Sequence, residues 1–550
     1  MSSFTLTGQI IDLWGNTIFP GKVLVENGII ISIIEDDTIE EKEYILPGFI
    51  DSHVHVESSM LVPSEFARLA VTHGTVATVS DPHEIGNVLG IEGVRYMIRN
   101  GEQTPFKFFF GASPCVPATS FETAGATISS EDIRSLFKED KLVYLSEMMN
   151  FPGVLNNDPE VMEKIALAKE FGKPVDGHAP GLRGAAAEAY AKAGITTDHE
   201  CYTLEEAEEK IGYGMHILIR EGSAAKNFPA LHPLIASNPS KVMFCSDDKH
   251  PDNLVKGHIN EIVKRSVDLG YDVMDVLRSA CLNPIKHYQL PVGSLREGDP
   301  ADFILINNLQ DFLVLKTYIN GQVVAEYGKA CFPSVDVAII NHFDTEKKSP
   351  EEFAVLAKGK TLRVIEVADG ELITKELQLD AKIIDGKAVS DPDNDILKIT
   401  VVNRYQNSTP AIAFIRNFGL KKGAIASSVG HDSHNIIAVG VNDEDLCTAV
   451  NALIDCKGGV AVVKGDAVSV LPLPVAGIMS PEDAYVVAEK YSALDLKAKE
   501  LGTTLEAPFM SLSFMALLVI PSLKLSDLGL FDGNSFSFTD LFIQEAKKHA

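Results

Sequence analysis

Short apolar runs and helix-like stretches alternate through the middle of the chain. The apolar runs have the length of buried strands. There are eight of them, at residues 48–56, 74–82, 106–114, 142–150, 174–180, 195–200, 216–224 and 241–248. Helix-like segments lie between them, for example at 63–73, 158–172 and 183–194. Eight β/α repeats in about 240 residues predict a TIM barrel, a (β/α)8 fold that places its chemistry at the carboxyl ends of the strands.

The two ends of the chain have a different texture. Residues 1–46 and 289–340 consist of short strand-like runs separated by turn residues such as GN and NG. The ends of a domain often lie close together, so these two pieces can pair into one small β-sandwich domain that flanks a barrel formed by residues 47–288. The charged, turn-rich stretch 341–353 is expected to be a linker, and residues 341–550 to form an additional C-terminal α/β domain.

Composition narrows the classes of partner. The chain has 550 residues, with 48 basic and 76 acidic side chains and a net charge of −28, which disfavours a nucleic acid partner. Its seven cysteines are scattered and form no CxxC motif, so neither a zinc ribbon nor a disulfide framework is indicated. The first residues lack a secretory pattern, and no apolar run approaches the roughly 20 residues of a membrane span. We expect a cytoplasmic protein without a membrane partner.

The stretch ILPGFIDSHVHVESSML, residues 45–61, places polar side chains at the end of an apolar run. Asp51, His53, His55 and Glu57 alternate there, so in a strand all four share one face. Unpaired burial of such groups costs several kcal/mol each as an order of magnitude. A metal ion would be a suitable partner.

Other predicted strands end in similar side chains. These are Glu147 on strand four, Asp176 and His178 on strand five, Asp198 and His199 on strand six, and Asp247 and Asp248 on strand eight. Imidazoles and carboxylates together suit Zn²⁺, Mn²⁺ or Fe²⁺. Because the carboxyl ends of barrel strands converge, the sequence predicts a metal centre at that end.

The motif LPGFIDSHVHVESS, with histidines ending strands five and six and an aspartate ending strand eight, resembles the amidohydrolase superfamily. Within it, the strings DSHVHVESSM, SDPHEIGNV, DGHAPGL and FCSDD resemble the adenine deaminase family. So do IASSVGHDSHN and VLPLPVAGIMS near the C-terminus. The resemblance thus covers nearly the whole chain.

The resemblance implies two divalent metal ions per chain, with Mn²⁺ or Fe²⁺ favoured and Zn²⁺ as a further option. It assigns His53, His55 and Asp247 to one ion, and His178 and His199 to the other. Many relatives bridge their two metals with a carboxylated lysine on strand four. This chain has Glu147 there, and a carboxylate can bridge directly.

The reaction implied is the hydrolytic deamination of adenine to hypoxanthine and ammonia, in purine salvage. A metal lowers the pKa of bound water from about 16 to about 7, and Asp247 is expected to move the proton to the leaving group. For protonation of the ring nitrogen N1 the sequence offers Glu57, His83, Glu84 and Glu200, with His83 and Glu84 placed in the catalytic set beside Asp247. If the strand continued through DPHE, Glu84 would point away from the face of its neighbours.

Six residues are expected to bind the substrate: Glu57, Asp81, Glu200, Asp248, His431 and His434. The last two lie in SSVGHDSHN, residues 427–435, which is polar and rich in glycine and serine. We expect this segment to cover the active site. The alternative is a solvent-exposed hairpin without a catalytic role.

Two other functions remain open for the sequence. One is a deacetylase of N-acetylated amino sugars, which shares the glutamate near strand four. The other is a non-catalytic barrel-fold binding protein, against which the presence of Asp247 argues. In every case we expect a homo-oligomer, a dimer or higher, that binds a small molecule.

Overall fold

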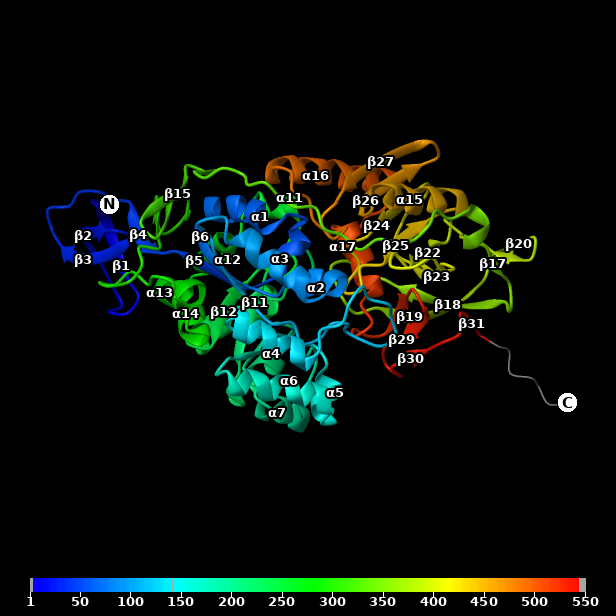
Figure 1. Ribbon diagram of the computed structural model, residues 1–550, viewed down its shortest axis with the longest axis horizontal. Helices are drawn as coiled ribbons and strands as arrows, with labels where there is room; N and C mark the ends of the chain where they lie inside the picture. Colours follow the sequence, from blue (N-terminus) through cyan, green and yellow to red (C-terminus); the bar gives the residue numbers. More distant parts are fainter. Residues whose placement is uncertain (1–2, 141, 544–550) are drawn as a thin grey trace.

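The computed structural model describes residues 3–140 and 142–543 and shows three parts along its long axis (Figure 1). The small β-domain lies at the left, the barrel in the middle, and the C-terminal domain, coloured yellow to red, at the right. The β-domain contains strands from both sides of the barrel sequence. Order in space therefore differs from order along the chain.

Eight parallel strands form the barrel, as predicted. They are β5 (Phe49–Val54), β6 (Thr75–Ser80), β7 (Lys107–Phe110), β8 (Leu145–Met148), β9 (Val175–Gly177), β10 (Thr197–Asp198), β11 (His216–Arg220) and β12 (Val242–Cys245). Neighbours pair in sequence order, and single bridges join the remaining edges, at Ala112–Leu145, Val175–Ile195 and Val54–Asp247. The last bridge connects the end of β12 to β5, so the carboxyl ends of all eight strands lie at one rim.

Helices connect these strands. They are α1 (Pro63–Ala70), α2 (His83–Leu89), α3 (Ile91–Gly101), α4 (Ser130–Glu139), α5 (Phe151–Leu155), α6 (Pro159–Glu170), α7 (Gly184–Lys192), α8 (Leu204–Gly212), α9 (Phe228–Leu231), α10 (Leu234–Ser237), α11 (Pro251–Leu254), α12 (Ile259–Asp268), α13 (Val273–Leu277) and α14 (Asn283–Tyr288). Local chemistry sets their ends: Asp158 caps α6, whose first residue is Pro159. The helices predicted at 63–73, 158–172 and 183–194 are confirmed as α1, α6 and α7.

The small β-domain is one sheet built from both flanks of the barrel. Its strands are β1 (Ser3–Asp12), β2 (Thr17–Glu26), β3 (Ile29–Glu35), β4 (Tyr44–Pro47), β13 (Phe303–Ile306), β14 (Val314–Ile319), β15 (Gln322–Glu326) and β16 (Lys329–Ala330). The order is β16-β15-β14-β13-β4-β1-β2-β3, so β4 and β13 join the two halves. Phe4 of β1 stacks on Tyr318 of β14 with ring centres 5.6 Å apart, although two strands separate β1 from β14. The sheet therefore folds over its own core in the manner of a sandwich.

The C-terminal domain is an α/β structure around a second large sheet. The sheet contains β18 (Thr361–Glu366), β19 (Lys375–Asp380), β22 (Ile396–Val402), β23 (Ala411–Arg416), β24 (Ala424–Ser427), β25 (Ile436–Gly440), β26 (Gly459–Lys464), β27 (Ala467–Pro472) and β31 (Phe542–Ile543). Two smaller sheets contain β17 (Val355–Leu356), β20 (Ile383–Ile384), β21 (Lys387–Ala388) and β28 (Leu523–Ser526), β29 (Gly529–Asp532), β30 (Ser537–Phe538). The helices are α15 (Asp443–Cys456), α16 (Ala484–Leu501) and α17 (Pro508–Ser513). In Figure 1, α17 lies between the barrel and the large sheet.

The segment 341–353 is packed rather than a free linker. Phe343 and Phe353 are buried in the core of the C-terminal domain. The Arg404 guanidinium, which is fully buried, donates to the carbonyl oxygen of His342 at 3.1 Å and to that of Ala476 at 2.7 Å. Two apolar side chains in a charged stretch are a weak signal in the sequence, and the arginine that holds the segment lies far along the chain at position 404, which explains why the linker prediction was wrong.

The barrel and the C-terminal domain also meet through backbone contacts. Ser480 donates its N–H to the Met60 carbonyl oxygen at 2.7 Å, and Val62 donates to the Ser480 carbonyl oxygen at 3.2 Å. These contacts fix the C-terminal domain beside the loop that follows β5. Among the described residues, no helix is both long enough and apolar enough to cross a bilayer.

Candidate active site

The carboxyl rim of the barrel brings together the side chains predicted to bind metal. They are His53 and His55 from β5 and the residue after it, Glu147 from β8, His178 after β9, His199 after β10, and Asp247 after β12. Each of the six exposes 6% of its surface or less. Six polar side chains from five strands thus share one buried space at the rim.

Glu147 lies at the centre of this cluster, and its two oxygens face different histidines. Oε1 lies 3.2 Å from His55 Nε2. Oε2 lies 2.7 Å from His178 Nδ1 and 3.1 Å from His199 Nε2. Burial alone would raise the pKa of the carboxyl group, but His178 and its neighbours outweigh burial and hold the pKa of Glu147 well below its usual range. Glu147 is therefore charged and contacts both halves of the cluster.

The histidines of β5 are placed as ligands would be. His53 Nε2 and His55 Nε2 lie 3.2 Å apart, and Asp247 Oδ1 lies 3.3 Å from the latter. Burial lowers the pKa of His53 to about 3, so this ring is neutral and keeps a lone pair. Against the opposing effect of burial, Asp247 and Glu147 raise the pKa of His55 well above its usual value. The space beside His55 Nε2 therefore favours a positive charge, whether that of a proton or of a metal ion.

The donor set fits a divalent cation. Within the part of the chain that the structure describes, His178 Nε2 is buried without a hydrogen-bond partner. Three overlapping groups each bring their donor atoms within 4.8 Å of one another: His53, His55 and Asp247; His53, Glu147 and His199; and His178, His199 and Glu200. Buried imidazoles and carboxylates at this spacing are the ligands that Zn²⁺, Mn²⁺ and Fe²⁺ prefer.

Asp247 has an unusual backbone conformation. Its φ of 53° lies in the left-handed region, which residues other than glycine rarely adopt. Hydrogen bonds on both sides hold it there, from Asp247 N to the His53 carbonyl oxygen at 2.9 Å and from His55 N to the Asp247 carbonyl oxygen at 3.3 Å. Strained backbone of this kind persists where the surrounding structure fixes a functional side chain.

Behind these residues, Asp51 ties β5 to β12. Its Oδ2 lies 2.7 Å from His258 Nε2, and its Oδ1 accepts the Ser246 N–H at 3.0 Å. It is fully buried and does not line the cavity. Asp51 therefore fixes the backbone beside the candidate ligands instead of binding metal itself.

A second polar cluster joins the barrel to the C-terminal domain at Glu84. The carboxylate pairs with His431 Nδ1 and with His434 Nε2. Against the opposing effect of burial, Glu84 raises the pKa of His431 to about 9, while the two imidazoles hold the pKa of Glu84 well below its usual value. Asp432 Oδ1 lies 3.5 Å from His83 Nε2. The segment 427–435 is thus buried against the rim. The alternative interpretation, a solvent-exposed hairpin, is therefore wrong.

Glu84 does not follow the alternation expected from a continuing strand. β6 ends at Ser80, and α2 begins at His83. Helical geometry brings both His83 and Glu84 to the cavity. The condition of a continuing strand is not met, so the alternation rule does not apply to Glu84.

Three residues predicted to bind substrate are not among the residues that line the cavity. Glu57 Oε1 accepts the Ile85 N–H at 3.2 Å beneath α2, and burial raises the pKa of Glu57 to about 7. Asp81 Oδ2 lies 3.1 Å from His83 Nδ1. His434 contacts Glu84. Glu57, Asp81 and His434 thus support α2, His83 and Glu84, whereas Glu200, Asp248 and His431 do line the cavity.

Sequence reasoning missed Arg220 and the apolar wall of the cavity. Arg220 ends β11 and contacts both Glu200 and Asp247. Like the predicted site residues, Arg220 lies at the carboxyl end of a predicted strand, the seventh. An arginine is not a metal ligand, however, so the search for metal ligands did not select it. The wall consists of Met149, Leu372, Phe514 and Leu517, and the last three come from the C-terminal domain, for which no local pattern points to a barrel rim.

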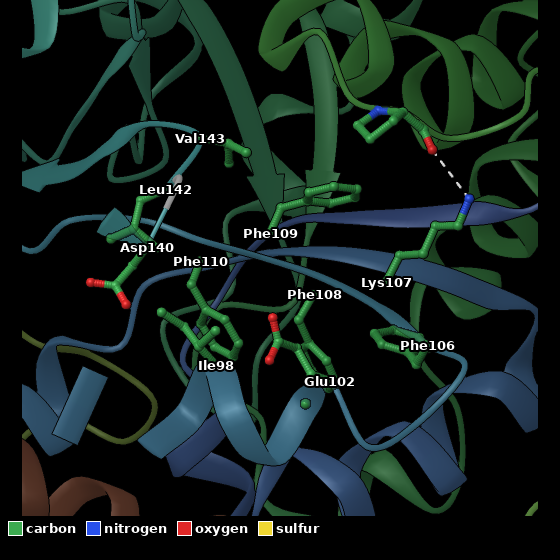
Figure 2. A pocket seen from close by; sticks show the side chains of 12 residues that line it. Ile98, Glu102, Phe106, Lys107, Phe108, Phe109, Phe110, Asp140, Leu142 and Val143 are labelled. Carbon is green, nitrogen blue, oxygen red and sulfur yellow. Dashed lines mark hydrogen bonds between the residues drawn. The ribbon is translucent and has the colours of Figure 1, made fainter. Parts of the chain in front are cut away.

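A larger cleft of about 470 Å³ lies elsewhere on the barrel, beside β7 and α3 (Figure 2). Phe106, Phe108 and Ile98 supply its apolar walls, and Lys107 is held by the Pro291 carbonyl oxygen at 3.1 Å. The residues described as lining it include neither histidine nor cysteine. Its size does not make it the reaction site, because the catalytic chemistry of this fold lies at the carboxyl rim.

Comparison with known proteins agrees with this placement. The amidohydrolase family matches residues 44–324, and the adenine deaminase C-terminal domain matches residues 371–537. An adenine deaminase of Sulfurovum sp. (strain NBC37-1) is 57% identical over 97% of this chain and 99% of its own length. Those of Salinibacter ruber and Methanosarcina mazei are 54% and 51% identical, each over 98% of this chain and 99% of its own.

Proposed function

We propose that the protein hydrolyses adenine to hypoxanthine and ammonia. The premise is plain: the chain belongs to the amidohydrolase family and, within it, to the adenine deaminases. One observation carries this proposal. A glutamate that contacts three histidines on the barrel rim lies beneath a segment of the adenine deaminase C-terminal domain. The amino-sugar deacetylase and the non-catalytic barrel are not favoured, because relatives that match nearly the whole chain are adenine deaminases.

The protein is a divalent-metal hydrolase, and we propose two ions per chain. His53, His55 and Asp247 would hold one ion, His178 and His199 the other, and Glu147 would lie between them. When bound, the metal supplies Lewis-acid activation of water at neutral pH. The resemblance to the adenine deaminases favours Mn²⁺ or Fe²⁺, and the nitrogen and oxygen donor set also suits Zn²⁺ as the further option.

Asp247 is the proposed proton carrier for the attacking water. Burial opposes ionisation, but the Arg220 guanidinium outweighs burial and holds the pKa of Asp247 well below its usual range. Asp247 is therefore a carboxylate that can accept a proton from the attacking water. It then returns this proton to the amino nitrogen that leaves from C6.

Glu84 is proposed to move the second proton, at the ring nitrogen N1. Its carboxylate shares hydrogen bonds with His431 and His434, so a proton can pass from an imidazolium through the carboxyl group to N1. The proton of the hydroxyl group on C6 returns to this cluster when the C6–oxygen double bond forms. His83 lies between Asp81 and Glu84, at 3.1 Å and 3.5 Å, and is proposed to orient the carboxylate and bind the base. Glu200 and Asp248 complete the polar lining.

Ammonia release tests the proposed function directly. Purified protein is reconstituted with Mn²⁺, Fe²⁺ or Zn²⁺ and assayed with adenine, adenosine and N-acetylglucosamine 6-phosphate. The proposal expects ammonia and hypoxanthine from adenine. Acetate from the amino sugar, with no ammonia from adenine, would overturn it.

We also propose that the protein is a homo-oligomer, a dimer or higher. β3 is an edge strand of the small β-domain and exposes Ile29, Ile31 and Ile34 by 39%, 44% and 45%. An exposed apolar edge strand favours pairing with another chain. Light scattering coupled to size-exclusion chromatography checks this, and a monomer at micromolar concentration would refute it.

A cytoplasmic location and a role in purine salvage complete the proposal. All seven cysteines are unpaired, which suits a reducing compartment. Hypoxanthine is a purine base, so the product can feed resynthesis of nucleotides. Fractionation of cells that produce the protein would test the location.

A further inference from the structure

Two neighbouring cavities share a partition at the barrel rim. The inner cavity, between the metal-binding cluster and the segment 427–435, measures about 30 Å³. The outer cavity measures about 390 Å³ and is lined by residues that include Tyr202 and Ile520. Glu200, Arg220 and Leu372 line both. Leu372 is the apolar member of this partition.

The inner cavity is too small for a purine base as it stands. Pockets that bind small molecules typically start near 300 Å³, and the outer cavity reaches that size whereas the inner one does not. The reacting carbon of adenine must lie at the metal-binding cluster. A base that enters from the outer cavity must therefore push the partition outward, and with its reacting carbon at the cluster its opposite, imidazole edge then faces Leu372.

A single buried lysine holds the apolar side of the partition. Lys524, on β28, donates from Nζ to the carbonyl oxygen of Leu372 at 2.7 Å and to that of Phe514 at 3.0 Å. Leu372 and Phe514 belong to segments far apart in the sequence, and both line the inner cavity. Lys524 is fully buried. One amino group thus joins two walls of the cavity.

The carbonyl oxygens of Leu372 and Phe514 are the polar partners that replace water around the Lys524 amino group. Desolvation is the cause that lowers its pKa, to about 7. Lys398, another buried lysine of the same domain, instead pairs with a carboxylate, Asp443 Oδ1, at 2.5 Å, besides the Phe353 carbonyl oxygen at 2.9 Å. Burying an amine is costly unless its donors are satisfied. The Lys524 amine therefore draws the Leu372 and Phe514 carbonyl groups together.

The segment around Leu372 is also tied to the barrel. Ala225 donates its N–H to the Gly370 carbonyl oxygen at 2.9 Å, and Arg220 Nε donates to the Ala225 carbonyl oxygen at 2.6 Å. The partition residue Arg220 is thus linked through Ala225 to the same segment that Lys524 holds. A shift of this segment would move the partition as a unit.

We propose that Lys524 is a positioning residue that fixes Leu372 as a size-selective wall, against which the imidazole edge of the substrate base packs after it passes through the outer cavity. The proposal rests on the proposed function. It predicts that purines substituted at N9 are rejected because Leu372 occupies the space their substituent needs.

The test compares adenine with 9-methyladenine in three variants. Leu372→Ala should raise the kcat/KM for 9-methyladenine relative to that for adenine by about tenfold or more, the scale of selectivity set by small apolar groups in a pocket. Lys524→Met should shift this ratio in the same direction and raise KM for adenine more than it lowers kcat. Lys398→Met is the matched control, since it removes a buried amine from the same domain and should lower Tm without changing the ratio.

The outcomes separate this proposal from the proposed function. A wild-type protein inactive on adenine would overturn the function. If the wild type is active but Leu372→Ala and Lys524→Met leave the selectivity ratio unchanged, only the proposal of a size-selective wall is overturned. An equal change in Lys398→Met would also overturn it, because the effect would then be one of general stability. If Lys524→Met does not fold, Lys524→Gln, which keeps an amide donor, and Leu372→Ala decide.

Discussion

Replacing Glu84 by glutamine would test the polar link between the barrel and the C-terminal domain. Glutamine keeps nearly the same volume but removes the charge that His431 and His434 face. In the wild type the pKa of His431 is raised from 6.5 to about 9, a difference worth about 3 kcal/mol at neutral pH. Because Glu84 is the main cause of this rise, Glu84→Gln should lower the free energy of unfolding by about that amount.

The raised pKa of His431 also predicts how the stability of the protein changes with pH. A histidine whose pKa is raised in the folded state contributes its full stability below 6.5 and loses it as the pH rises toward 9. Urea unfolding of the wild type should therefore show a fall in stability over this interval. Glu84→Gln should show a smaller fall, since the ion pair is already absent at the lower pH. A variant with the same slope as the wild type would contradict the pairing.

The activity assay addresses the proposed proton transfer. If Glu84 moves the proton to N1, Glu84→Gln should lower kcat/KM for adenine by at least about 10², the usual scale for a general acid or base. Glu57→Gln is the matched control, because Glu57 is equally buried but lies outside the cavity, and burial already raises its pKa to about 7. The control should remain close to wild type. Wild-type kinetics in Glu84→Gln would refute the catalytic reasoning.

Three further predictions concern the metal-binding cluster. Asp247→Asn should lower kcat by at least about 10² while calorimetry still detects adenine binding; near-normal turnover would assign the proton transfer elsewhere. Glu147→Ala removes the carboxylate between the two histidine groups, so elemental analysis should show the doubly loaded state weakened most, and unchanged occupancy would exclude the bridge. Chelation should abolish activity and lower Tm, since metal stabilises only the folded state; Mn²⁺ or Fe²⁺ should restore both, and an active metal-free protein would refute the site.

The barrel and its metal-binding rim could be predicted because their signals are local. Each strand is a short apolar run, and His53, Glu147 and Asp247 each lie at the end of one. The geometry of a closed barrel then supplies the long-range information, because it brings all these ends together. Recognition of eight strands was thus enough to place residues that are distant in sequence within a few ångströms of one another.

The remaining parts of the site depend on contacts that no local pattern reveals. The direction of Glu84 follows from a helix that begins at His83, one residue after Pro82, where the alternation of a strand no longer applies. The contact of Lys524 with Leu372 joins segments that are separated by most of the C-terminal domain. Partners of this kind are selected by tertiary packing, which propensity and periodicity do not encode.

The pairing of β4 with β13 has a consequence for synthesis of the chain on the ribosome. Leu46 of β4 lies opposite Ile304 of β13, so the entire barrel is translated between the two partners. At 5–20 residues per second, β4 waits on the order of 10–50 s for the strand that covers its edge. During that time β1 to β4 expose apolar side chains and unpaired backbone groups, which invites aggregation or capture by a chaperone. Co-production of a chaperone that covers these strands during the interval should therefore raise the yield of folded protein.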